Sequence, residues 1–220
     1  MAKMDRRTWL AMAGMAPFAS TAWAQARGEK YAWPDMSARE TIRKRYFPDV
    51  ILRTHENRSV RLYEDCVKDR FVTINFMYTN CIDGTCPVTT YNLTLVQQLL
   101  KERVGRDIFM LSITLDPEHD TPNLLNRYAR SYGVGPGWLF LRAEPKDTEM
   151  IRRKLGFYDR DPAVDAKKAN HVAMLRYGDE PRQLWNAINA MVAPRTVANA
   201  ILSAADLPGP NRPGWKRVAR

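Results

Sequence analysis

The feature that most constrains this chain is a run of strand-forming residues that ends directly before a cysteine pair and a helix. Residues 70–79, RFVTINFMYT, are almost continuously apolar or β-branched, which is typical of a strand covered on both faces. Cys81 and Cys86 follow, with four residues between them, and Pro87 then opens a segment with apolar residues at helical spacing. We therefore expect a strand, a loop that carries two cysteines, and a helix, in that order.

The position of Cys86 at or just before the first turn of this helix predicts a reactive thiol. Unpaired N–H groups and the positive end of the helix dipole favour a thiolate there, so we expect the pKa of Cys86 to be lowered. A disulfide that closes so short a loop adds little stability, because the entropic gain grows with loop length. The pair therefore indicates either metal binding or thiol–disulfide exchange. Cys66 stands apart near the end of an expected second strand, and we expect it to be a small buried core residue.

The rest of the chain alternates between the two kinds of element. A short helix or arm over 37–46 and a hairpin that turns at residues 55–57 come before the first buried strand. Further strands are expected over 107–115, 138–143, 171–178 and 181–188, and further helices over 123–133, 146–157 and 194–205. This order predicts an α/β fold with a central mixed sheet, helices on both faces and an N-terminal hairpin. A cysteine pair on the first strand-to-helix turn is the thioredoxin-like arrangement.

The first residues predict export. Residues 1–24 hold a basic start that includes Arg6 and Arg7, a mildly apolar stretch and the small-residue pattern Ala22-Trp23-Ala24, which together are typical of a twin-arginine signal peptide. The expected location is the bacterial periplasm. We expect four segments: the signal over 1–24, a lead-in over 25–46, one domain over 47–206, and a basic, proline-rich tail over 207–220.

The net charge of +10 does not predict nucleic-acid binding, because basic residues are spread along the chain and mixed with acidic ones. A basic surface that meets anionic lipid heads or an acidic partner is the better interpretation.

Three segments resemble the Sco/SenC family of copper-handling assembly factors for cytochrome c oxidase. They are VTINFMYTNCIDGTCPVTTYNL, SITLDPEHDTP and NHVAMLRY, within a resemblance that covers about residues 47–206. The resemblance implies a thioredoxin-like fold that binds one copper ion through Cys81, Cys86 and His171. It also implies a supporting, non-ligating role for Asp116. His171 is expected as the first residue of its strand.

The resemblance implies a metallochaperone that accepts copper from a periplasmic donor and delivers it to the oxidase subunit that carries the binuclear copper site. Two thiolates and an imidazole suit Cu(I), and such a set also holds Cu(II). The chain departs from the family in the loop, where four residues separate the cysteines instead of three. A thiol–disulfide oxidoreductase without stable metal remains the alternative. His55, expected to be exposed at the hairpin tip, and His119, in a loop, are not included among the ligands.

Overall fold

The computed structural model describes residues 36–171 and 173–207. The expected signal over 1–24, the first part of the lead-in and nearly all of the basic tail lie outside these residues. No helix in the described part is long and apolar enough to cross a lipid bilayer.

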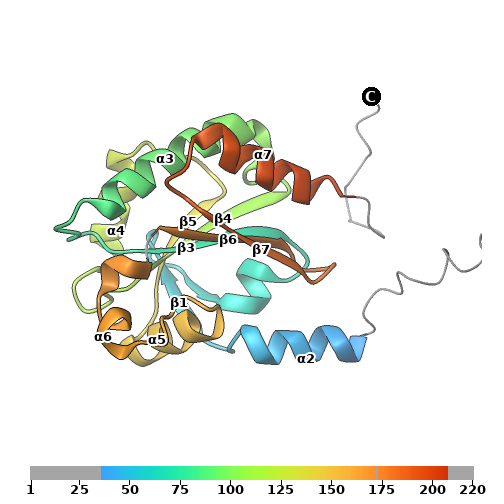
Figure 1. Cartoon of the computed structure of the whole chain (residues 1–220), viewed down its shortest axis with the longest axis horizontal. Coiled ribbons are helices and arrows are strands. Elements are labelled where there is room, and N and C mark those ends of the chain that lie inside the picture. Colours follow the sequence, from blue (N-terminus) through green and yellow to red (C-terminus); the bar gives the residue numbers. More distant parts are fainter. Residues whose placement is uncertain (1–35, 172, 208–220) are drawn as a thin grey trace, which may run out of the picture. The chain divides into compact units, whose positions relative to one another are not determined.

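A seven-stranded mixed sheet forms the centre of the fold, in the order β2-β1-β5-β4-β3-β6-β7 (Figure 1). The central strand β3 pairs in parallel with β4 and antiparallel with β6. The strands are β1 (Ile51–Thr54), β2 (Ser59–Arg61), β3 (Phe71–Met77), β4 (Ile108–Thr114), β5 (Trp138–Arg142), β6 (Met174–Asp179) and β7 (Leu184–Asn189). The mixed sheet and the N-terminal hairpin β1–β2 confirm the predicted α/β class.

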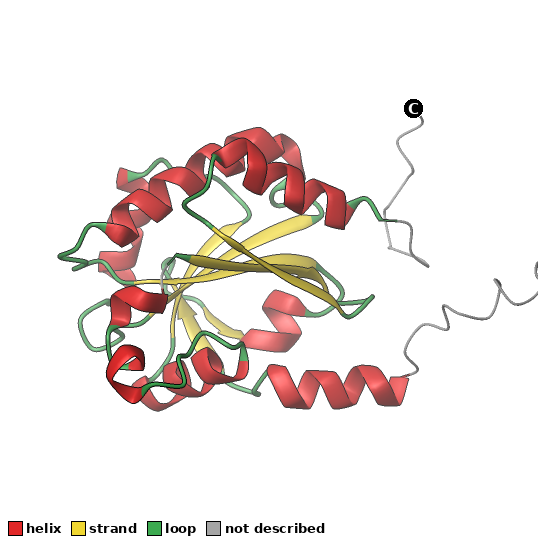
Figure 2. Ribbon diagram, viewed as in Figure 1, coloured by secondary structure: helices red, strands yellow, loops and turns green. Residues whose placement is uncertain are grey.

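Helices cover both faces of the sheet. In Figures 1 and 2, α3 and α7 lie side by side on one face, and α2 and α5 lie on the other. The α-helices are α2 (Met36–Tyr46), α3 (Thr85–Leu100), α4 (Pro122–Ser131), α5 (Pro145–Lys154), α6 (Pro162–Asp165) and α7 (Pro194–Ala205). The shorter helical segments are η1 (Leu62–Val67), η2 (Lys101–Arg103) and η3 (Lys168–His171).

Every residue of β3 is buried, as the unbroken run of strand-forming residues predicts. Alternate side chains enter the two layers of helices. On one face Phe76 meets Phe157 edge to face, with ring centroids 4.7 Å apart. Because β3 is fixed on both sides by neighbouring strands, the loop that follows Met77 starts from a rigid position.

The segment that contains Cys66 is helical, so the prediction that a second strand extends to this residue is wrong. β2 ends at Arg61, and the chain continues as the π-helix η1. The carboxylate of Asp65 accepts a hydrogen bond from the backbone N–H of Arg61 (2.6 Å), the last residue of the edge strand β2, and so ties the start of η1 to the end of this strand. The expectation that Cys66 is buried is confirmed, since its exposed fraction is 1%.

The expected strand over 171–178 begins three residues late. His171 is the last residue of η3, and β6 starts only at Met174. Sequence analysis also missed α6, which the carboxylate of Asp161 caps by accepting from the N–H of Ala163 (2.9 Å), while Pro162 opens the helix.

Candidate metal centre

The two cysteines of the loop lie side by side at the end of β3. The backbone N–H of Cys86 donates to Sγ of Cys81 (3.2 Å), and the N–H of Tyr78 contacts Sγ of Cys86 (3.4 Å). Cys86 is fully buried, Cys81 is partly exposed, and both are free thiols. The backbone of the loop therefore positions both sulfurs without a disulfide.

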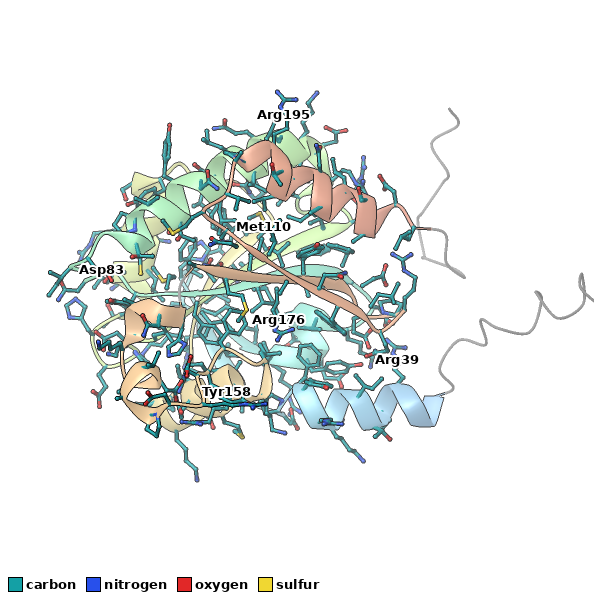
Figure 3. The ribbon with its side chains drawn as sticks, in the orientation of Figure 1. Arg39, Asp83, Met110, Tyr158, Arg176 and Arg195 are labelled. Carbon is teal, nitrogen blue, oxygen red and sulfur yellow. The ribbon has the colours of Figure 1, made fainter. Side chains whose placement is uncertain are left out.

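The helix after this loop begins two residues earlier than predicted, at Thr85, so Cys86 lies inside its first turn. Gly84 precedes the helix in a left-handed conformation (φ +76°), which glycine adopts at little cost. The carboxylate of Asp83 accepts from the N–H of Thr85 (3.0 Å) and from the thiol of Cys81 (3.0 Å). Sequence analysis did not select Asp83, which lies at the exposed tip of the loop (Figure 3).

The expectation of a lowered pKa at Cys86 is wrong. Burial raises the pKa of this thiol, and the hydrogen bond with Cys81 raises it further. The contact from the backbone N–H of Tyr78 lowers the pKa, but less strongly. The neutral thiol is therefore the preferred form, because removing a side chain from water disfavours its charged form more than one helix terminus favours it.

The buried carboxylate of Asp120 holds the start of the cysteine loop through hydrogen bonds at the ends of β3 and β4. Asp120 accepts from the backbone N–H of Thr79 (3.1 Å) and from the hydroxyls of Thr79 and Thr114. These residues follow β3 and end β4, so Asp120 ties together the ends of the two central parallel strands. The N-terminus of α4 is capped by the neighbouring Thr121, whose side chain accepts from the N–H of Leu124.

His171 belongs to a different network. Its Nε2 donates to the carbonyl oxygen of Asp165 (2.8 Å) and lies 3.2 Å from Nη1 of Arg152. Arg152 in turn forms a buried ion pair with the Asp165 carboxylate (2.6 Å). The residue as a whole is 5% exposed, and it lines a cleft of about 550 Å³. The side chain is therefore held by α5 and α6.

Asp116 lies on the same cleft and connects it to the loop after β4. Its carboxylate pairs with Nζ of Lys168 (3.0 Å), and Lys168 is the first residue of η3, which His171 ends. Asp116 thus contacts the segment that carries the histidine.

The structure brings Cys81 and Cys86 together but does not group His171 with them. In the part of the chain that the structure describes, no three His, Cys, Asp or Glu side chains are grouped as a metal ion would require. His119 is exposed, whereas His55 is half-buried and accepts from the N–H of Phe140 (3.2 Å), so the expectation of an exposed His55 is wrong. Burial lowers the pKa of His55.

Comparison with solved structures shows a shared fold. Yeast Sco1, described with copper bound, has a TM-score of 0.60 at 20% identity over 76% of this chain and 96% of that chain. BsSco, described as having a disulfide switch and as a member of the Sco family of cytochrome c oxidase assembly proteins, has a TM-score of 0.57 at 22% identity. That match covers 72% of this chain and 92% of the other. The thioredoxin-like fold of these proteins is the one predicted from the cysteine loop.

Sequence alignments with curated proteins cover shorter stretches of the chain than the structural matches do. The SCO1 protein homolog of Bacillus subtilis (strain 168) is 35% identical over 68 residues, which are 30% of this chain. The alignment spans 34% of that protein, about a third of its length. The profile of the SCO1/SenC family, in contrast, matches residues 52–206, from β1 to the end of α7. This match covers more than half of the chain, and the protein therefore belongs to the SCO1/SenC family.

Proposed function

We propose that this protein is a copper metallochaperone whose cargo binds at the β3–α3 loop. The observation that carries the proposal is the pair of free thiols, five positions apart, placed together by backbone hydrogen bonds. Membership of the SCO1/SenC family and the copper bound to yeast Sco1 support the choice of metal.

The donor set fits copper on chemical grounds. Thiolate sulfur is a soft ligand that favours Cu(I) over the harder divalent ions. One sulfur is buried and one is partly exposed, so an ion held here is accessible to a partner from one side. Because Cys86 prefers its neutral form, binding releases a proton, and a transfer site gains from ligands that are readily reprotonated.

We propose His171 as the third ligand, together with Cys81 and Cys86. In the described structure its Nε2 is engaged by Asp165 and Arg152, so this contact has to open before the nitrogen can bind a metal ion. Asp116 then acts in support, because its ion pair with Lys168 restrains the segment that carries the histidine.

The partners we propose are a periplasmic copper donor and the cytochrome c oxidase subunit that holds the binuclear copper site. The description of BsSco as a member of a family of oxidase assembly proteins supports the second partner. The twin-arginine pattern in residues 1–24 supports export to the periplasm, and the positive net charge supports contact with an anionic membrane surface.

Anaerobic titration of the reduced protein with Cu(I) tests the cargo and its ligands. We expect saturation near one ion per chain, near-complete loss of tight binding in Cys81→Ala and Cys86→Ala, and weaker binding in His171→Ala. Cys66→Ala is the matched control, because Cys66 is a free thiol outside the loop and should leave binding unchanged. Full copper uptake by either loop variant would rule out this site.

A thiol–disulfide oxidoreductase is the second candidate, and one observation favours it. The structure assembles the two thiols without the imidazole, which is sufficient for dithiol chemistry and incomplete as a three-ligand site. Metal analysis of protein isolated from the periplasm, paired with a reductase assay on a disulfide substrate, separates the two functions. Stoichiometric copper with slow turnover supports the chaperone, and metal-free protein with rapid turnover supports the oxidoreductase.

A further inference from the structure

A second cleft, of about 780 Å³, lies between α2, the end of α5 and the strands β6 and β7. Its charge is one-sided. Among the described residues its lining holds four cationic side chains and no acidic one: Arg45, Arg153, Lys154 and Arg176. Figure 3 shows Arg176 and Tyr158, which also lines the cleft, on the side of the sheet that α2 and α5 cover.

Two of these cations have structural partners. Lys154 donates to the carbonyl oxygens of Lys44 and Arg45 (3.1 Å each) and so satisfies the C-terminal end of α2. Arg153 pairs with the carboxylates of Glu149 and Asp165. Both side chains therefore already bind acceptor oxygens of the protein itself.

Arg176 has no such compensation. It is half-buried on β6, and its Nε is inaccessible to water and has no hydrogen-bond partner within the described residues. Its Nη2 rests against Gly156, where an added Cβ would lie only 2.5 Å away. The glycine (φ +76°) thus leaves room for the guanidinium. A guanidinium that is partly withdrawn from water and has no counter-charge among the described residues favours the binding of an anion.

Two neighbouring polar groups in the same cleft are also unpaired within the described residues. The indole Nε1–H of Trp185, whose ring packs on Phe47 (5.1 Å between centroids), is buried without an acceptor. The amide oxygen of Gln183 is also unpaired, but it is an acceptor and gives no hydrogen bond to an anion; the amide nitrogen donates to the carbonyl and the carboxylate of Glu180 (2.6 and 2.9 Å). Buried donors in native proteins are nearly always paired, with protein or with ordered water, so the indole N–H of Trp185 is a donor that a ligand in this cleft can use.

We propose that this cleft binds a phosphate group, with Arg176 as its main anchor and Arg45 and the indole N–H of Trp185 as further donors. The three donors come from three different elements, so a group with more than two acceptor oxygens satisfies them better than a carboxylate. The phosphate belongs either to a soluble ligand or to the head of an anionic phospholipid. The proposal does not depend on copper binding.

Calorimetric titration of the full chain with inorganic phosphate tests the site directly. We expect saturable binding that weakens at least tenfold in Arg176→Gln and a few-fold in Trp185→Phe. Arg195→Gln is the matched control, because Arg195 is an exposed arginine on α7, on the opposite side of the sheet (Figure 3), and its loss should leave affinity unchanged.

Vesicles distinguish the source of the phosphate. Binding to phosphatidylglycerol vesicles but not to phosphatidylcholine vesicles, with the same dependence on Arg176, assigns the site to a lipid head. Binding of free phosphate alone assigns it to a soluble ligand. Absence of both, or equal losses in Arg176→Gln and Arg195→Gln, would overturn the proposal.

Thermal unfolding provides a second readout that a purely structural role would not produce. Without phosphate, Arg176→Gln should be at least as stable as the unmodified chain, because an uncompensated charge is removed. With phosphate, only the unmodified chain and Arg195→Gln should gain melting temperature. If Arg176→Gln does not fold, Arg45→Gln carries the same comparison, and an undiminished phosphate response in that variant would contradict the proposal.

Discussion

The two cysteines and the histidine of the proposed copper site are held in two different ways. Cys81 and Cys86 are positioned by their own turn, through backbone N–H groups within eight residues of each sulfur. His171 is positioned by side chains from α5 and α6, through the buried Arg152–Asp165 pair. A pair of ligands close in sequence is preformed by local geometry, whereas a distant ligand is placed by whichever tertiary contact binds it most strongly.

The two sets of contacts also differ in how much of the fold is disturbed when they are broken. The cysteine loop rests on Asp120 and on strands whose register is fixed, so a large change there disrupts the fold. The histidine rests on a charge network of side chains that line a cleft and belong to helices outside the sheet. We therefore expect the sulfurs to form the fixed part of the site and the imidazole to form its movable part.

Removal of Asp120 should have the largest effect on stability. Asp120→Ala removes the shared acceptor of the buried Thr114 hydroxyl and of the half-buried N–H and hydroxyl of Thr79, so we expect the free energy of unfolding to fall by about 3 to 4 kcal/mol. Chemical denaturation measures this change. Asp116→Ala is the control, since it removes a partly exposed ion pair with Lys168 and should cost less than about 1 kcal/mol. Equal losses of unfolding free energy in the two variants would mean that the hydrogen bonds of Asp120 do not stabilise the cysteine loop.

Breaking the Arg152–Asp165 pair should come next. Asp165→Ala leaves Arg152 buried without its main counter-charge, and we expect a loss of about 3 kcal/mol. The double variant Arg152→Met with Asp165→Leu removes both charges and should recover most of that loss. Denaturation curves of the single and double variants measure the recovery.

The same double variant sharpens the contrast between fixed and movable ligands. It removes the contacts of His171 Nε2 with Arg152 and with the Asp165 carboxylate and leaves only the hydrogen bond to the main-chain carbonyl of residue 165. Cu(I) affinity should therefore rise relative to the unmodified chain while the Cys81 and Cys86 contributions stay the same. Competition with a chromophoric Cu(I) chelator measures this affinity. A fall in copper affinity in a well-folded double variant would show that the charge network places His171 for binding instead of withholding it.

The smallest effect concerns the third cysteine, which lies in the core and outside the site. Burial raises the pKa of the Cys66 thiol to about 11, so the folded state holds this proton more tightly than the unfolded chain does. The resulting stability is fully present below the ordinary thiol pKa of 9.0 and is lost as pH rises toward 11. Between pH 8 and pH 11 the unmodified chain should therefore lose about 2 kcal/mol more than Cys66→Ala does. Parallel pH curves of the two proteins would contradict this assignment.

The main elements followed from local patterns. The apolar run of β3 and Pro87 in the first turn of α3 placed the cysteine loop at a strand-to-helix turn, and this placement is correct. The strand that was expected to continue through Cys66 ends at Arg61, where the carboxylate of Asp65 bonds to the backbone N–H of Arg61 and the chain continues as η1. The α6 turn could have been predicted from Asp161 and Pro162, which form an N-terminal capping pattern.

The electrostatic prediction at Cys86 failed for a tertiary reason. The helix terminus was visible in the sequence, but the burial of the thiol depends on how β3, α3 and their neighbours pack. The role of Asp120 was hidden for the same reason, since two of its three bonds go to Thr79, 41 residues away.

The sequence by itself determined the class of fold, the order of its main strands and helices and the placement of both cysteines on one loop, because each of these depends on residues within a few positions of one another. Only the tertiary structure decided that His171 is bound by Arg152 and Asp165, that the Cys86 thiol prefers its proton, and that Arg176 faces a cleft without an acidic side chain among the described residues. Burial and the choice of charge partner depend on which distant segments are packed together, and no local pattern contains that information.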